Sequence, residues 1–452
     1  MTLINIVNSK NLIKFLNFLF IFFPLAFIIG NFAINMNIMM ILIVGSLIYK
    51  IELIKIFKEN VFIFVILFFI VIIYSTLFDS FSEVDNNNFI KSLLYLRYLI
   101  LLLVLNCMMK NDDFNLKFFL LSCLFFSFIL SLDIIFQYFV GQDIFGFKSR
   151  RFHNSGFFDD ELIAGGYIQR FAILGIFSLP LIFYNNKKKL FITLSISLFI
   201  SVIGIILSGN RMPLILYFLF IFIAILFLRE IRGPLIITFI SGILVFLLVA
   251  NSNRMYQDYW ISFKNNIKNF LPKVNEAYDK EKLKLKSEKG KIFIEEWYEG
   301  KKGNIKLTHF GSGHAIIYVT AFDTWRDKLF LGSGIKSFRI KCKTKLHLPN
   351  RVCSSHPHNY YLEILNDTGL LGGILFFGSV FYILIRRLKK YSKNKNGEIS
   401  NDFILLAISM CLIIEIFPLK SSGSFFSTYN SAFIFLLMGL LSNSQDTKKI
   451  KN

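Results

Sequence analysis

The chain has 452 residues, of which 55% are hydrophobic and only 17% are charged. Soluble domains usually carry about 25% charged residues, so this composition excludes a soluble globular protein. The net charge of +21 would suit a nucleic-acid-binding protein, but the lysines lie mainly between apolar runs and no nucleic-acid-binding module is present. We therefore expect no nucleic-acid partner and interpret the positive charge as a signal of membrane topology.

Apolar runs of about 20 residues, the length at which a helix crosses a bilayer, recur along the whole chain. Lys10 and Lys14 precede the first run, but no small-residue cleavage site follows it, which predicts a retained first helix and not a signal peptide. The pattern predicts an all-α integral membrane protein with about twelve transmembrane helices. The expected spans are 13–32, 34–50, 60–78, 90–108, 116–140, 166–184, 190–207, 213–228, 233–250, 361–385, 402–418 and 428–442.

An even number of spans places both termini on the same side of the membrane. From a cytoplasmic N-terminus, each cytoplasmic loop is basic and the opposite loops are acidic or neutral, as the positive-inside rule requires. This pattern predicts a multi-pass protein of the inner (plasma) membrane with cytoplasmic N- and C-termini. The basic loops contain Lys50, Lys55 and Lys58; Lys110; Lys187 to Lys189; Arg229 and Arg232; the stretch from Arg386 to Lys395; and the tail from Lys448 to Lys451.

The segment 251–357 is long, polar and lysine-rich. Long segments are translocated regardless of their charge, so we expect a large periplasmic loop subdomain between spans nine and ten. Its tryptophans, Trp260, Trp297 and Trp325, favour a folded unit. Cys342 and Cys353 flank a short polar stretch and can form a disulfide if the loop faces an oxidising compartment. The expected organisation is spans one to nine in 1–250, the loop subdomain in 251–360, spans ten to twelve in 361–442, and a cytoplasmic tail in 443–452.

The most informative stretch is His356-Pro357-His358-Asn359, which ends the polar loop and leads into the tenth predicted span. Histidine exchanges a proton near neutral pH, so an imidazole at the mouth of a helix could deprotonate a sugar hydroxyl. A polar helix start without a catalytic role is the alternative interpretation. Glu363 and Asp367 share one face of the following helix, where a carboxylate could orient His358 or only favour the helix dipole.

His358-Asn359 is followed after nine residues by Gly369 and then by Gly372, and this spacing resembles the signature of the O-antigen ligase family of membrane glycosyltransferases. Weaker fragments of the same family pattern occur in order within residues 130–440. They are Gln137-Tyr138-Phe139, Gly141-Gln142-Asp143, Gly156-Phe157-Phe158, Ser208-Gly209-Asn210-Arg211 and Leu331-Gly332-Ser333-Gly334.

The resemblance implies transfer of a glycan from polyprenyl pyrophosphate to an acceptor hydroxyl at the periplasmic face, without a metal, a cofactor or a nucleotide sugar. It implies His358 as the general base, supported by His356, Asn359, Glu363 and Gly369. The expected partners are the lipid-linked donor, lipid A-core or another glycan acceptor, and membrane lipids.

A pyrophosphate leaving group needs its developing negative charge neutralised, and an arginine fork suits phosphate oxygens. Arg211 lies in a short turn between two apolar helices, where it could hold these phosphates or anchor the chain at the lipid headgroups. Arg97 lies inside the fourth predicted span, where a charge requires a polar partner or a cavity. Asp133 and Glu415 also lie inside spans and could pair with Arg97 or only lock helices together.

The sequence departs from the family in the loop, where many members have an arginine before a tryptophan and a Gly-x-Gly turn. The corresponding stretch here is Gly311-Ser312-Gly313-His314. His314 could replace the arginine as a donor-phosphate ligand, or Arg326, Lys328 or another loop lysine could supply the charge. Arg151, Arg170 and the lysine-rich stretch 278–306 add positive potential that could attract an anionic donor.

Two rival functions stay open. An O-antigen or exopolysaccharide polymerase, or a protein O-oligosaccharyltransferase, would use the same donor with a different acceptor. A transporter of polyprenyl-linked glycans would need no catalysis, but transporters often contain two related halves, and no internal repeat is evident here. The sequence favours the ligase.

Overall fold

A computed structural model describes residues 3–56, 60–80, 86–183, 185–252, 254–268, 313–348, 351–393 and 401–443. Within these ranges the chain consists of helices and loops, and its only extended pairing is two isolated β-bridges. The expectations about 278–306, Trp297 and the tail after residue 443 lie outside the described residues.

The helices follow the apolar runs of the sequence closely, and two predicted spans, 116–140 and 428–442, coincide with observed helices. The α-helices are α1 (Leu3–Ile29), α2 (Asn31–Ile56), α3 (Asn60–Ser80), α4 (Asn86–Lys110), α5 (Leu116–Val140), α6 (Ala164–Gly175), α7 (Ser178–Ile182), α8 (Lys187–Leu207), α9 (Arg211–Phe227), α10 (Arg232–Ala250), α11 (Arg254–Lys268), α13 (Gly313–Arg326), α14 (Phe338–Lys341), α15 (Tyr360–Lys393), α16 (Asn401–Glu415) and α17 (Thr428–Ser442).

Nine spans among the described residues are long and apolar enough to cross a membrane. The remaining three predicted spans correspond to α9, α16 and α17, which are apolar but shorter. One of the nine, Ala164–Ile182, is divided into α6 and α7. The protein is therefore a multi-pass, all-helical membrane protein, and a count of twelve crossings stays a prediction.

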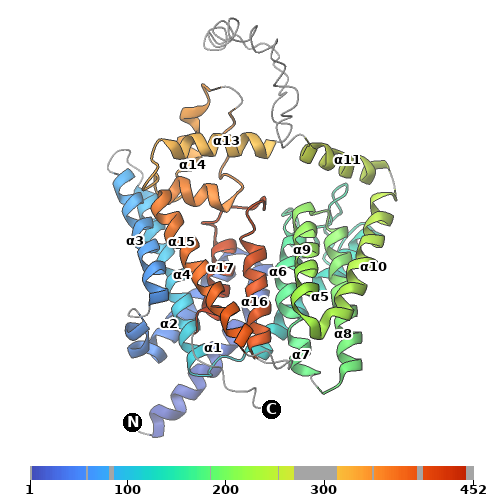
Figure 1. Cartoon of the computed structure of the whole chain (residues 1–452), viewed down its shortest axis with the longest axis horizontal. Helices are drawn as coiled ribbons and strands as arrows, with labels where there is room; N and C mark the ends of the chain where they lie inside the picture. The colour runs from blue at the N-terminus through green and yellow to red at the C-terminus, as the bar shows by residue number, and fades with distance from the viewer. Residues whose placement is uncertain are drawn as a thin grey trace, which may run out of the picture.

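The helices form one bundle with two sides joined through its middle (Figure 1). On one side α15 packs against α3, and α17 against α4; on the other side α8 packs against α5 and α10. Helix α16 contacts both α17 and the α6–α9 side. Phenylalanines fill much of the interior, whereas exposed apolar side chains cover the outside of the helices, as expected where lipid replaces water.

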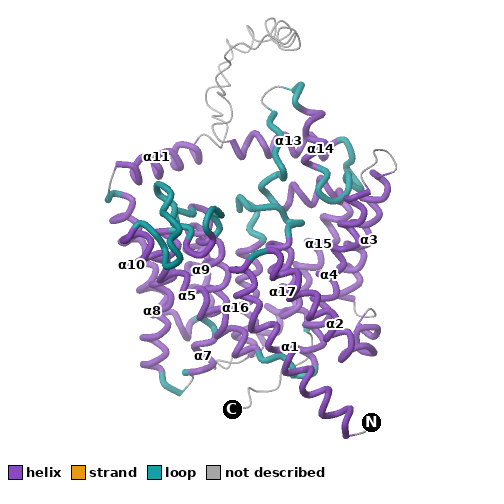
Figure 2. The backbone as a smooth tube through the Cα atoms, turned by 180° about the vertical axis from the view of Figure 1, so that it is seen from behind, coloured by secondary structure: helices purple, strands orange, loops and turns teal. Residues whose placement is uncertain are grey.

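Helices α11, α13 and α14 lie together on one face of the bundle in both views (Figures 1 and 2), and we call it the α13 face. Helix α1 begins at the opposite face. Helix α17 ends beside the last turn of α4, where Asn443 Nδ2 donates to the carbonyl of Met109 at 2.9 Å. The α13 segment is attached to α3 by an ion pair between Lys328 Nζ and Asp79 Oδ1 at 2.5 Å.

Helix α15 is interrupted at Gly369, which has φ +67° and ψ −169°. A Cβ at this position would approach the carbonyl oxygen of Phe330 to 2.2 Å, so only glycine fits. The main-chain groups freed by the break bond to the preceding loop: Leu370 N donates to Leu329 O at 2.8 Å, and Gly334 N donates to Asp367 O at 2.9 Å. These hydrogen bonds fix the loop before α14 against α15. They also satisfy main-chain groups that could not remain unpaired in apolar surroundings.

Candidate functional site

The predicted histidine motif forms a tight turn at the start of α15 on the α13 face. His358 adopts φ +57°, a left-handed conformation that is unfavourable for a residue with a Cβ. Asn359 caps the helix, because its Oδ1 accepts a hydrogen bond from Leu362 N at 3.2 Å. A strained non-glycine residue held at a helix start is a common feature of functional sites.

Three imidazoles meet at this turn: those of His356 and His358, which are two residues apart, and that of His314 from α13. The ring centroids of His356 and His358 are 4.1 Å apart, and those of His314 and His358 are 5.0 Å apart. Ser354 Oγ lies 3.4 Å from His358 Nε2. The structure thus brings together His314, His356 and His358, all of which the sequence singled out.

The cluster keeps its imidazoles neutral. Burial, followed by the proximity of His356 and His314, lowers the pKa of His358 to about 4. Burial likewise lowers the pKa of His356 and that of His314. A neutral imidazole at physiological pH has a free lone pair and can accept a proton.

Two cations that sequence reasoning did not name lie near this cluster. The positive charge of Arg339 acts on both His356 and Glu363. Lys336 is half-buried, and its pKa is lowered by burial and then by the like charges of Arg339 and Lys91. Lys336 and Arg339 come two and five residues after the Gly332-Ser333-Gly334 turn, which α15 holds in place, but nothing in the local sequence places this turn against α15.

The two carboxylates of α15 bond to main-chain and hydroxyl groups and not to His358. Glu363 accepts hydrogen bonds from Ser424 Oγ at 2.5 Å and Phe425 N at 2.6 Å. Asp367 accepts from Lys336 N at 2.6 Å and Ser337 Oγ at 3.0 Å. Both carboxylates therefore hold the loops around the histidine turn, and an orienting role toward His358 stays a prediction.

A buried ion network lies beneath the histidine turn. Glu415 accepts hydrogen bonds from Arg170 Nε at 2.9 Å, Arg170 Nη2 at 2.6 Å and Tyr360 OH at 3.0 Å. It also forms an ion pair with Lys420 Nζ at 2.7 Å. Arg170 Nη2 also donates to Asn430 Oδ1 at 2.6 Å. The partner of Glu415 is thus Arg170 and not Arg97.

Arg97 and Asp133 have separate environments. Arg97 donates to Leu94 O at 2.9 Å and to Tyr98 OH at 2.7 Å, and its guanidinium lies over the Tyr98 ring. Asp133 accepts from Ile144 N at 3.1 Å. Among the described residues, no hydrogen bond or ion pair joins Arg97 to Asp133, Glu415 or the histidines.

Arg211 begins α9 and is engaged with α11. Its guanidinium carbon lies 3.5 Å from the centroid of the Tyr259 ring and 5.0 Å from that of Phe263, and its Nη2 donates to Tyr259 O at 2.7 Å. Within the described part of the chain no contact links Arg211 to the histidine cluster. Its predicted role in phosphate binding is neither supported nor contradicted by this packing.

The other candidate loop cations are placed differently. Lys328 is paired with Asp79, and Arg326 is exposed at the end of α13. Arg151 is exposed in the loop after α5. Arg339, by contrast, acts electrostatically on His356, and Lys336 acts on Glu363 and Asp367.

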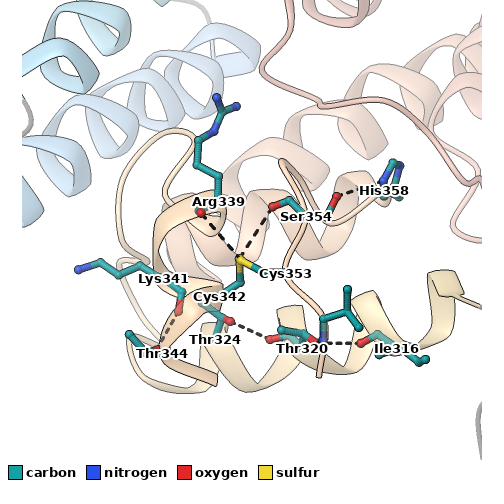
Figure 3. Close-up of a disulfide and its surroundings, with 11 residues drawn as sticks. Ile316, Thr320, Thr324, Arg339, Lys341, Cys342, Thr344, Cys353, Ser354 and His358 are labelled. Atoms are coloured by element: carbon teal, nitrogen blue, oxygen red, sulfur yellow. Dashed lines mark hydrogen bonds between the residues drawn. A yellow bond between two sulfur atoms is a disulfide. The ribbon is translucent and has the colours of Figure 1, made fainter. Parts of the chain in front are cut away.

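Cys342 and Cys353 are joined by a disulfide with a Cα–Cα distance of 5.3 Å (Figure 3). The bond connects the end of α14 to the segment that leads to the histidine turn. In this segment Ser354 contacts both Cys342 Sγ and His358. Buried Ala321 and Phe338 pack around Cys342. Ser354 therefore connects the disulfide to the His358 ring.

The motif fragments at the end of α5 and in the loop after it are joined to one another by hydrogen bonds. Gln137 is fully buried; its Nε2 donates to Phe147 O at 3.0 Å and its Oε1 accepts from Gly156 N at 2.8 Å. Asp143 Oδ1 accepts from Phe145 N and Phe147 N. Asn154 Nδ2 donates to Leu207 O at 2.6 Å. These contacts tie the loop to the Ser208–Arg211 turn.

A multi-pass helical protein that gathers neutral imidazoles and cations at one helix mouth is equipped to accept a proton beside an anion. The model of the O-antigen ligase family matches residues 196–377, which include Arg211, His314, the disulfide, His358 and Gly369. This match, over residues 196–377, supports an O-antigen ligase or polymerase-type membrane glycosyltransferase. No curated protein matches the chain.

Proposed function

We propose that this protein is an O-antigen ligase-like glycosyltransferase, which moves a glycan from polyprenyl pyrophosphate to an acceptor hydroxyl such as that of lipid A-core. The observation that carries the proposal is the cluster of three neutral imidazoles at the start of α15, with Arg339 beside it. General bases of this kind contribute about 10²–10⁴ in rate.

In the proposed reaction His358 accepts the proton of the acceptor hydroxyl. The hydroxyl oxygen then forms a bond to the anomeric carbon of the donor glycan, and the bond from that carbon to the pyrophosphate oxygen breaks. The leaving polyprenyl pyrophosphate takes the electron pair, and nearby cations stabilise its charge. The proton on His358 is lost to solvent after transfer.

The lowered pKa of His358, about 4 in the free protein, is consistent with this role. A free imidazole with this pKa is a weak base, but a bound pyrophosphate would place negative charge nearby and raise the pKa. The base would therefore gain strength when the donor is present. His314 and His356, which are positioned against the same ring, would respond in the same way.

The donor phosphates are proposed to lie between the histidine cluster and Arg339 with Lys336. His314 contributes a hydrogen-bond donor in this arrangement. Arg211 and Arg97 remain proposed phosphate ligands on the family resemblance, and Arg211 keeps a half-exposed guanidinium. The reaction is proposed to need no metal ion, so treatment with EDTA should leave the transfer rate unchanged.

The α13 face is proposed to be periplasmic and both termini cytoplasmic, in the inner membrane. The disulfide on the α13 face supports this orientation, because such bonds persist in oxidising compartments. Labelling of single cysteines with a membrane-impermeant maleimide tests it. A cysteine at exposed Arg326 should react in intact spheroplasts, and one at exposed Lys188 should react only after lysis.

The decisive experiment deletes the gene and profiles lipid-linked glycans and finished surface glycolipids by mass spectrometry, with wild-type and His358→Ala complements. A ligase predicts long lipid-linked chains that accumulate without reaching lipid A-core, in the deletion and the variant alike. Single repeat units on the acceptor would indicate a polymerase, and loss of glycan from proteins would indicate an oligosaccharyltransferase. Normal output from a stably expressed His358→Ala protein would overturn the catalytic assignment and favour transport without catalysis.

A further inference from the structure

The conformation of His358 depends on a neighbouring loop. Residues 416–427 connect α16 to α17, and we call them the 416–427 loop. Within it, Ser422 N donates to the carbonyl of His358 at 3.0 Å. Tyr318 OH, from α13, lies 3.3 Å from the same carbonyl oxygen. These two donors hold the left-handed peptide in place.

The same loop is bonded to the residues that follow His358. Asn359 Nδ2 donates to Pro418 O at 2.7 Å, and Tyr361 OH donates to Ile416 O at 2.9 Å. His358, Asn359 and Tyr361 are thus each attached to the 416–427 loop, at Ser422, Pro418 and Ile416 respectively. Any displacement of this loop would be transmitted to the backbone that carries the His358 ring.

The loop is anchored at its start by the buried ion network. Lys420 reaches back to Glu415, with Nζ 2.7 Å from Oε1 and 3.2 Å from the main-chain oxygen, and so closes the first turn of the loop on itself. The same carboxylate is bound by Arg170 from α6 and by Tyr360 from α15. Arg170, Glu415 and Lys420 are at most 8% exposed, so their charges depend on one another.

We propose that the Arg170–Glu415–Lys420 network positions His358, with Lys420 as the residue that locks the 416–427 loop under the histidine turn. The catalytic consequence rests on the proposed function, but the positioning itself does not. Lys420 is a positioning residue because two of its three N–H groups are directed at Glu415. Its ammonium also lies over the Tyr360 ring, at 5.3 Å from the centroid.

The test is Lys420→Met, which removes one cation and leaves Arg170 and Glu415 as a balanced pair. Lys188→Met is the matched control, since Lys188 is exposed and lies in the first turn of α8. Hydrogen–deuterium exchange at the imidazole C2 position, followed by mass spectrometry in detergent, reports the pKa of each histidine without any substrate. Exposed His347 serves as the internal reference.

We expect the pKa of His358 to rise from about 4 toward 6.5 in Lys420→Met, because the turn relaxes and its ring becomes hydrated. In Lys188→Met the pKa of His358 should not change. An unchanged His358 pKa in folded Lys420→Met would overturn the proposal, because a network that only stabilises the bundle would not alter this pKa. If Lys420→Met does not fold, Tyr360→Phe provides the second variant, since it removes one hydroxyl from Glu415 and keeps all three charges.

The transfer assay separates positioning from substrate contact. Misplacement of a base by about 1 Å can cost on the order of 10²-fold, so Lys420→Met should lower kcat strongly with little change in the KM for the donor, and Lys420→Arg should restore part of the rate. A raised KM with unchanged kcat would show that Lys420 contacts the donor, which overturns the positioning role. If the wild-type protein transfers no glycan, the proposed function fails, whereas the exchange experiment still tests the position of His358.

Discussion

Two helix starts on the α13 face carry the residues that the sequence singled out, and they differ in what surrounds them. At the start of α15, His358 meets the imidazole of His356 from the same turn and that of His314 from α13, and the cation Arg339 acts on His356. At the start of α9, Arg211 is stacked on Tyr259 and Phe263 of α11. Both starts match family fragments, but the first gathers three imidazoles, whereas the second places a single imidazole, that of His153, beside Arg211.

The two helix starts also differ in the geometry of their backbones. The backbone of His358 is held in an unfavourable conformation by donors from α13 and from the 416–427 loop. Such strain persists only where surrounding structure enforces it. Arg211 has ordinary helical geometry at an N-terminus, and aromatic stacking accounts for much of its surroundings. The predictions below test whether this difference separates catalysis from binding.

The largest effect is expected within the histidine cluster itself. His358→Ala should lower the transfer rate by about 10²–10⁴-fold, because it removes the proposed base. His356→Ala should cost only about tenfold, since His356 acts on His358 by lowering its pKa and filling space. Glycan transfer by the purified variants, with lipid-linked donor isolated from the deletion strain, measures both. Equal losses in the two variants would mean that the base is not His358 alone.

Removal of the cation beside the cluster should have the next largest effect. Arg339→Ala should raise the KM for the donor by about 10- to 100-fold, because a charged hydrogen bond to phosphate contributes about 1.5–3 kcal/mol. Arg326→Ala is the control, since Arg326 is exposed at the end of α13. The same transfer assay over a range of donor concentrations checks this. Identical KM values for the two variants would place the donor phosphates elsewhere, and would favour the start of α9.

Much of the fold was predictable from the sequence, because lipid leaves few alternatives to long apolar helices. The residues of α5 and α17 were predicted to the residue. The histidine cluster was partly predictable, since His314, His356 and His358 lie in polar stretches between spans. The partner of Glu415 was not, because Arg170 is 245 positions away and only the packing of α6 against α16 joins them. Arg339 was missed because nothing in its local sequence shows that α15 breaks at Gly369 and holds the preceding loop.

Loss of the disulfide should loosen the loop that leads to the start of α15 without affecting the start of α9. Closing a short loop of this kind contributes about 3 kcal/mol of ordering free energy, so a Cys342→Ser/Cys353→Ser variant should show faster amide exchange across 338–358 and a transfer rate several-fold lower. Amide exchange around Arg211 should stay as in the wild type. Reductant should reproduce the change in the wild-type protein and do nothing further to the double variant. Unaltered exchange in 338–358 after reduction would show that the non-covalent contacts hold this loop on their own.

The smallest effect is expected at Arg211, and it separates phosphate binding from attachment of α11. Arg211→Ala should raise the KM for the donor by about fivefold, or about 1 kcal/mol, as expected for a half-exposed charge, with little change in kcat. Tyr259→Phe is the matched variant, because Tyr259 OH donates to Gly209 O at 2.7 Å and ties α11 to the same turn, while the ring under Arg211 remains. If Tyr259→Phe raises the KM as much as Arg211→Ala does, the position of α11 and not the charge of Arg211 is responsible. A normal KM in Tyr259→Phe, together with the fivefold rise in Arg211→Ala, would make the start of α9 a second contact for the donor and reduce the contrast between the two helix starts.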